Sequence, residues 1–152
     1  MTFKQAVQGA PPPVNKAYRP GLQALGSESS KIQGRPRAFS GSIDLDSALR
    51  QARPNDCRWD YGIGVRRGHW EEAFWVEVHS ADTRGGTEVL RKLQWLKEYL
   101  RREAPSLGAI TRAEAPYIWI ASGPVHIPRN TPQYRRLANS GLRGPLREYV
   151  LG

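Results

Sequence analysis

Two acidic residues and a histidine occupy positions from which they could bind a metal ion. Asp60 lies in the segment 58–65, and Glu77 and His79 lie in the segment 73–79. Carboxylates that face each other repel unless a proton or a cation lies between them. A divalent ion such as Mg²⁺ or Mn²⁺ takes hard oxygen ligands and activates a bound water molecule. We therefore expect Asp60 and Glu77 to bind Mg²⁺ or Mn²⁺, with His79 as a further ligand, proton donor or orienting group.

The two segments are predicted to pair as a β-hairpin. Large apolar side chains alternate with small or polar ones in residues 58–65, apolar side chains recur at every second position of residues 73–79, and Gly68 lies between the two segments. If Gly68 and His69 form a two-residue turn, residues that face each other have numbers that sum to 137. Asp60 then lies directly across from Glu77. The alternative is that both carboxylates point into solvent, because antiparallel sheets often have one wet face.

The rest of the chain predicts a single α/β domain over residues 43–152. A helix over residues 44–52, capped by Ser42, precedes the hairpin, and a longer amphipathic helix runs from Thr87 to a point before Pro105. A buried strand over residues 117–121 follows, then a helix over 131–138 and a second turn or helix that ends at 149–151. The expected order is αββαβα, with one small mixed β-sheet flanked by helices.

These residues in this order resemble the core of the PD-(D/E)XK nuclease superfamily over residues 43–122. Asp60 matches the metal-binding Asp of that family, and Glu77-Val78-His79 matches its Glu-x-Lys triplet. The resemblance implies that the carboxylates bind magnesium and that a basic residue positions or activates the attacking water. His79 stands where the family has Lys, Asp60 does not follow Pro, and no strand is evident before Asp60.

Some members of the family carry the basic residue on the next helix, which makes Lys92 a second candidate for this role. If neither His79 nor Lys92 serves, the resemblance implies an inactive relative that only binds its substrate. Asp44 or Asp46 could add a third acidic ligand, although an Asp at a helix start commonly caps it.

The histidines and Cys57 raise two other chemistries, metal-free RNA cleavage and zinc binding. His79 and His126 each follow a predicted strand and could cleave RNA without a metal, as acid and base. The spacing of the histidines and Cys57 matches no zinc pattern, and a lone cysteine forms no intramolecular disulfide.

The strong positive charge predicts a nucleic-acid partner, either DNA or RNA. Lys and Arg total 23 against 14 Asp and Glu, which gives a formal net charge of +9. Such a charge attracts phosphate polyanions, although it could also belong to a merely solvated basic surface. The arginines near the C-terminus are candidates for phosphate contacts: Arg129, Arg135, Arg136, Arg143 and Arg147.

Residues 1–42 are expected to form an extended or flexible basic arm. They contain five prolines, many small polar residues and little aliphatic periodicity. Too few apolar groups are present to offset the entropy of ordering them. Either as a free arm or as a coat wrapped around the domain, they are expected to lie outside the core.

Three functions fit these observations. The first is a metal-dependent nuclease or a degenerate nuclease-like domain, and the second is a non-catalytic nucleic-acid-binding protein. The third is a protein-interaction module, such as a toxin, antitoxin or phage-related accessory factor, in which case a homodimer or a complex with a protein partner is expected. No segment has the roughly 18 apolar residues of a membrane span, so a cytoplasmic location without membrane contact is expected.

Overall fold

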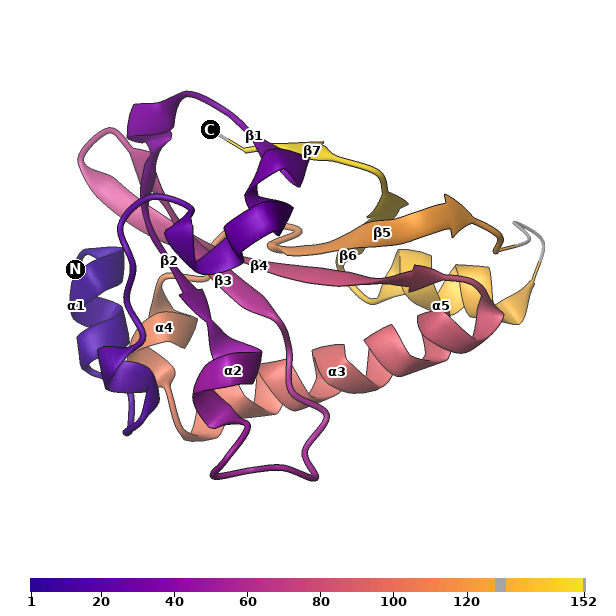
Figure 1. Cartoon of the computed structure of the whole chain (residues 1–152), viewed down its shortest axis with the longest axis horizontal. Coiled ribbons are helices and arrows are strands. Elements are labelled where there is room, and N and C mark those ends of the chain that lie inside the picture. Colours follow the sequence, from indigo (N-terminus) through magenta and orange to yellow (C-terminus); the bar gives the residue numbers. More distant parts are fainter. Residues whose placement is uncertain (128–130, 152) are drawn as a thin grey trace.

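A five-stranded mixed sheet with the order β2-β3-β4-β5-β6 forms the centre of the protein (Figure 1). The computed structural model describes residues 1–127 and 131–151. Strand β3 (Tyr61–Arg67) runs antiparallel to both of its neighbours, β2 (Phe39–Asp44) and β4 (Trp70–Ala81). Strand β5 (Tyr117–Val125) is parallel to β4, and β6 (Leu142–Leu146) is parallel to β5. The predicted α/β class, with a mixed sheet flanked by helices, is confirmed.

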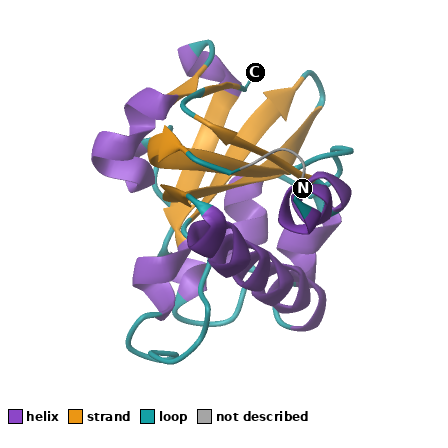
Figure 2. Cartoon of the chain, turned by 90° about the vertical axis from the view of Figure 1, so that its right-hand side faces the viewer, coloured by secondary structure: helices purple, strands orange, loops and turns teal. Residues whose placement is uncertain are grey.

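Helices lie on both sides of the strands (Figure 2). The longest, α3 (Thr83–Arg102), connects β4 to β5, and this crossover is what allows the two strands to run parallel. The shorter helices are α1 (Phe3–Gln8), α2 (Leu45–Leu49), α4 (Pro105–Ala109) and α5 (Pro132–Asn139), with 3₁₀ turns at Val14–Lys16, Gln23–Lys31 and Pro36–Ala38. In the described part of the chain, no helix is long and apolar enough to span a bilayer.

Each face of the sheet has its own hydrophobic core. On one face, three fully buried tryptophans pack with the apolar stripe of α3; they are Trp59, Trp75 and Trp119. On the other face, Ile63, Val76 and Ile118 pack under the 3₁₀ segment Gln23–Lys31 and its Leu25. Because side chains alternate along a strand, odd-numbered residues of β4 such as Glu77 face α3.

The hairpin between β3 and β4 has the predicted register. Tyr61 pairs with Val76 and Arg67 pairs with Trp70, so the numbers of paired residues sum to 137 throughout. The turn consists of Gly68 and His69, and Gly68 has a positive φ of 65°. A two-residue hairpin turn favours this left-handed conformation, which glycine adopts without steric cost.

Several element boundaries differ from the prediction. Helix α2 is shorter than the helix predicted over residues 44–52. Asp44 caps it by accepting the Ser47 N–H, whereas Ser42, the predicted cap, belongs to β2. Strand β2 itself was missed, because its Ser and Gly residues do not show the alternation of a strand. Helix α3 begins at Thr83 rather than Thr87, because Asp82 caps it by accepting the Gly85 N–H.

The expectation that residues 1–42 lie outside the core was wrong. Helix α1 lies beside the β2 and β3 end of the sheet (Figure 1), and its Phe3 and Val7 are fully buried. A Cβ added to Gly64 would lie 2.4 Å from Phe3, so this glycine makes room for the aromatic ring. The six-residue helix is too short to show helical periodicity in sequence, although Phe3 and Val7 have its i, i+4 spacing.

The C-terminal segment forms strands where a second turn or helix was expected. Strand β6 extends the sheet beside β5, and β7 (Tyr149–Val150) pairs in parallel with β1 (Ile32–Gln33). Pro145 in β6 is tolerated because β6 is an edge strand, where a missing N–H leaves no ladder bond unmade. The pairing partners of both strands are distant in sequence, so local patterns carry little information about them.

Candidate functional site

The carboxylates of Asp60 and Glu77 meet at the start of the hairpin, as the register predicts. Asp60 directly precedes β3, and its backbone N–H donates to Glu77 Oε1 at 3.1 Å. The Val78 N–H in turn donates to Asp60 Oδ2 at 3.0 Å. One oxygen of each carboxylate is therefore held by the backbone of the opposite strand segment, which leaves Asp60 Oδ1 and Glu77 Oε2 for other partners.

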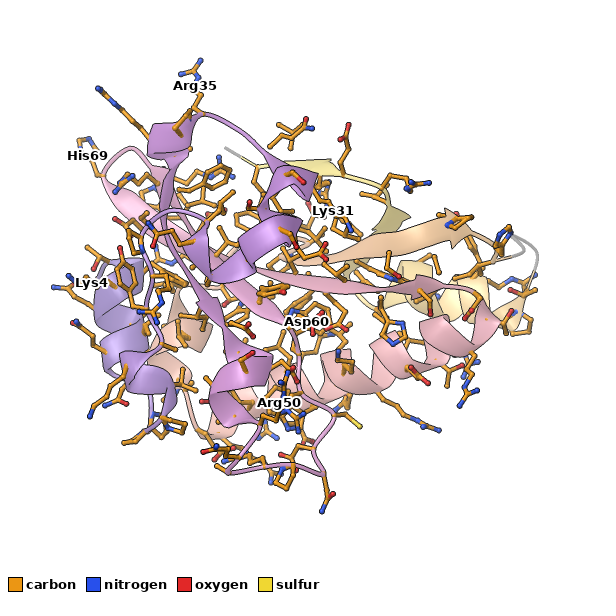
Figure 3. All side chains as sticks on the ribbon, viewed as in Figure 1. Lys4, Lys31, Arg35, Arg50, Asp60 and His69 are labelled. Carbon is orange, nitrogen blue, oxygen red and sulfur yellow. The ribbon has the colours of Figure 1, made fainter. Side chains whose placement is uncertain are left out.

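Both remaining oxygens contact the ammonium group of Lys92 on α3. Lys92 Nζ lies 3.4 Å from Asp60 Oδ1 and forms an ion pair with Glu77 Oε2. The apolar stripe of α3 packs on the sheet and places Lys92 over the hairpin. Asp60 lies near the middle of the molecule (Figure 3). Two carboxylates from the sheet thus converge on one cation from the helix.

Helix α3 buries this cluster to different depths. The Glu77 side chain is fully buried, whereas the side chains of Lys92 and Asp60 are 18% and 20% exposed. The alternative in which both carboxylates point into solvent is therefore wrong for Glu77. The amphipathic stripe of α3 is the cause, because it covers the face of the sheet on which Glu77 lies.

Burial sets the ionisation of the three groups. Burial and then the charge of Asp60 raise the pKa of Glu77 to about 8, and Lys92 opposes this rise. Burial also raises the pKa of Asp60. Burial on its own would lower the pKa of Lys92, but the charges of Glu77 and Asp60 outweigh it and raise that pKa. Burial thus favours the protonated form of both carboxyl groups, while their charges keep the Lys92 ammonium group protonated.

His79 contacts Glu88 and not the two carboxylates of the candidate site. Its Nε2 lies 2.8 Å from Glu88 Oε2 on α3, and Arg84 lies on the other side of Glu88 at 3.6 Å. Among the described residues, no hydrogen bond or ion pair joins His79 to Asp60 or Glu77. Lys92 is therefore the basic residue that contacts the carboxylates, and His79 is not.

Within the described part of the chain, no third acidic ligand joins the pair. Asp44 caps α2, and Asp46 forms ion pairs with Arg50 and Arg58. Over residues 1–127 and 131–151, no group of three or more His, Cys, Asp or Glu side chains is arranged to hold a metal ion. A metal at this site would take two protein carboxylates and obtain its remaining ligands from water or substrate.

A cleft of about 370 Å³ opens beside Lys92. Its lining comes from α2, the loop before β3 and α3, and consists of Asp46, Asp56, Cys57, Arg58, Glu88, Arg91 and Lys92. The loop is tied to α3, because Trp95 Nε1 donates to Asp56 Oδ2 at 2.9 Å and Arg53 forms an ion pair with Glu103. These contacts hold the loop against α3 on one side of the cleft. Lys92 lines the cleft and also contacts the two carboxylates.

Comparison with protein-family models, with curated proteins and with solved structures finds no match to this chain. The resemblance to PD-(D/E)XK nucleases therefore stays a prediction.

The predicted phosphate-binding arginines lie on other elements than the cleft. Arg135 and Arg136 are exposed on α5, Arg143 is exposed on β6, and Arg147 is exposed beyond it, whereas Arg129 falls outside the described residues. The cleft instead contains Arg58 and Arg91, which the sequence reasoning did not select. The position of Arg91 next to the candidate Lys92 was a signal that could have identified it.

Proposed function

We propose that this protein is a divalent-metal-dependent phosphodiesterase that acts on nucleic acid. The observation that carries the proposal is the convergence of Asp60 and Glu77, from two adjacent strand segments, on one cation position beside a cleft. Magnesium is commonly held by one or two carboxylates together with water and substrate phosphate oxygens. The two carboxylates fit Mg²⁺ or Mn²⁺ in the same way.

The donor set supports a hard divalent ion. Asp60 Oδ1 and Glu77 Oε2 both face the place now taken by Lys92 Nζ, and both carboxyl groups have raised pKa values that added positive charge would relieve. When bound there, such an ion would polarise a phosphoryl oxygen and lower the pKa of a coordinated water.

The chain's own residues have distinct roles in this proposal. Asp60 and Glu77 would hold the ion, and the backbone N–H groups of Val78 and Asp60 fix the orientation of the two carboxylates. Because Lys92 Nζ now takes the cation position, the ion would displace it toward the cleft that Lys92 lines. There the ammonium group would orient the attacking water or stabilise charge on the phosphate. The net charge of +9 attracts the polyanionic substrate.

A second function is favoured by one feature of the same site. Lys92 occupies the cation position between the carboxylates, as expected of a closed structural ion-pair cluster. In that case the protein binds nucleic acid without cleaving it, and Asp60 and Glu77 serve only to anchor α3 to the sheet.

Calorimetric titration with Mg²⁺ and Mn²⁺ separates the two functions. Wild type is expected to bind one ion, and the Asp60→Asn/Glu77→Gln double variant is expected to bind none. Glu98→Gln is the control, because Glu98 is an exposed carboxylate on α3, the helix that carries Lys92. Cleavage of labelled DNA and RNA should follow the same pattern. If wild type binds neither ion, with or without an oligonucleotide, and cleaves nothing, the phosphodiesterase proposal is overturned in favour of the binding protein.

A further inference from the structure

Each acidic residue that lines the cleft has a partner within the protein. Asp46 forms ion pairs with Arg58 at 2.9 Å and with Arg50 at 2.7 Å. Asp56 accepts a hydrogen bond from Trp95 Nε1 and lies 3.7 Å from Arg53. Asp46 therefore presents little uncompensated negative charge to a ligand, whereas Asp56 shares Arg53 with Glu103.

The third carboxylate and two of the three cations of the cleft are paired as well. Glu88 contacts His79 and Arg84. Arg58 is held by Asp46, and Lys92 is held by the carboxylates of the candidate site.

Arg91 is the exception. Its side chain is exposed and lines the cleft, and within the described residues it has no hydrogen bond, ion pair or ring contact. It is adjacent to Lys92 on α3, so the free guanidinium lies at the same cleft as the candidate site. A guanidinium presents paired N–H donors that match the oxygens of a phosphate group.

The size of the cleft restricts what can enter it. A volume of about 370 Å³ is near the lower end of the roughly 300–1,000 Å³ of small-molecule sites. Its walls are braced by the Trp95–Asp56 hydrogen bond and the Arg58–Asp46 ion pair. A space of this size has room for one nucleotide and not for a double helix, whose phosphates lie on the outside of a wide rod.

We propose that the cleft admits one nucleotide of a single strand and that Arg91 binds its phosphate next to Lys92. This inference rests on the proposed function, because Lys92 both lines the cleft and contacts Asp60 and Glu77. The substrate of the proposed phosphodiesterase is then single-stranded nucleic acid, including the frayed ends and loops of larger molecules.

Equilibrium binding of fluorescently labelled oligonucleotides tests this inference, in EDTA so that no cleavage occurs. A single strand and the duplex of the same sequence are compared at several salt concentrations, with wild type, Arg91→Ala, Arg91→Lys and Arg102→Ala. Arg102 is the matched control, because it is an exposed arginine in the last turn of the same helix. All variants replace exposed side chains, and circular dichroism verifies that they fold.

Wild type is expected to bind the single strand more tightly than the duplex. Arg91→Ala should weaken single-strand binding by about tenfold, as expected for loss of a hydrogen bond to a charged group. It should also reduce the slope of log K against log salt by about 0.7, the value for one phosphate contact on a single strand. Arg102→Ala should change binding less than about twofold, and Arg91→Lys should restore part of the affinity.

Equal effects of Arg91→Ala and Arg102→Ala, or tighter binding of the duplex, would overturn the inference. The proposed function can fail separately, because it depends on metal binding by Asp60 and Glu77. If the carboxylates bind the metal and Arg91 proves dispensable, only the inference about the cleft is lost. If Arg91 binds the single strand but the carboxylates bind no metal, the inference about the cleft holds and the phosphodiesterase is lost.

Discussion

The backbone N–H of Asp60 donates to the Glu77 side chain at 3.1 Å, so the segment that precedes β3 is anchored to β4 through a buried carboxylate. The Val78 N–H returns a hydrogen bond to the Asp60 side chain at 3.0 Å. This exchange holds two carboxyl groups close together in a poorly solvated place, which favours a proton or a cation between them. The ammonium group of Lys92 contacts both carboxyl groups. The stability of the protein should therefore depend on the protonation of Glu77 and on the presence of a cation between the two groups.

The pH dependence of stability should report the burial of Glu77. Because the pKa of Glu77 is raised from 4.5 to about 8 in the folded protein, the folded state keeps a proton that the unfolded state loses between these pH values. The free energy of unfolding should therefore fall as the pH rises from about 5 to about 8. Urea denaturation at a series of pH values measures this slope.

Glu77→Gln should flatten the slope, because an amide does not ionise. Glu98→Gln, which replaces an exposed carboxylate on α3, should leave the wild-type slope unchanged. If Glu77→Gln loses stability with pH as steeply as wild type does, the buried carboxyl group is not the source of the slope.

Removal of the Lys92 ammonium group should destabilise the protein, and divalent ions should reverse the loss. Lys92→Met leaves Asp60 and Glu77 facing each other without a cation. The free energy of unfolding should fall by about 3 kcal/mol, the lower end of the range for a broken buried ion pair, because the Lys92 side chain is 18% exposed. Urea denaturation with and without millimolar Mg²⁺ measures both effects.

Lys97→Met is the control for this experiment. Lys97 lies on the same helix but donates to the Ser140 carbonyl, away from the carboxylates. Mg²⁺ should stabilise Lys92→Met more than wild type and should not alter Lys97→Met selectively. If Mg²⁺ stabilises none of the three proteins, the carboxylate pair does not hold a divalent ion.

The N-terminal segment should contribute strongly to stability. Phe3 is fully buried against Gly64, and its N–H donates to Glu71 at 2.8 Å. Phe3→Ala should lower the free energy of unfolding by about 3–5 kcal/mol, whereas Gln8→Ala, at an exposed position of the same helix, should change it by less than about 0.5 kcal/mol. Similar small effects of both substitutions would mean that the segment is not docked on the sheet in solution.

Local sequence patterns are enough to predict the relationship between Asp60 and Glu77. Strand alternation and the Gly68-His69 turn specify a hairpin register, and a register places two residues opposite each other whatever the rest of the fold does. The apolar stripe of α3 could also be predicted from the sequence, because helical periodicity is a local property. The positive charge is likewise independent of the fold.

Long-range packing determines how deeply Glu77 is buried, which basic residue contacts it, and where the N-terminal segment lies. His79 and Lys92 were both candidates, and the packing of α3 on the sheet directs Lys92 to the carboxylates while Glu88 takes His79. Phe3 enters the core because Gly64 leaves a space 61 residues away in sequence. Such contacts depend on the free energy of packing between distant segments, which no local pattern encodes.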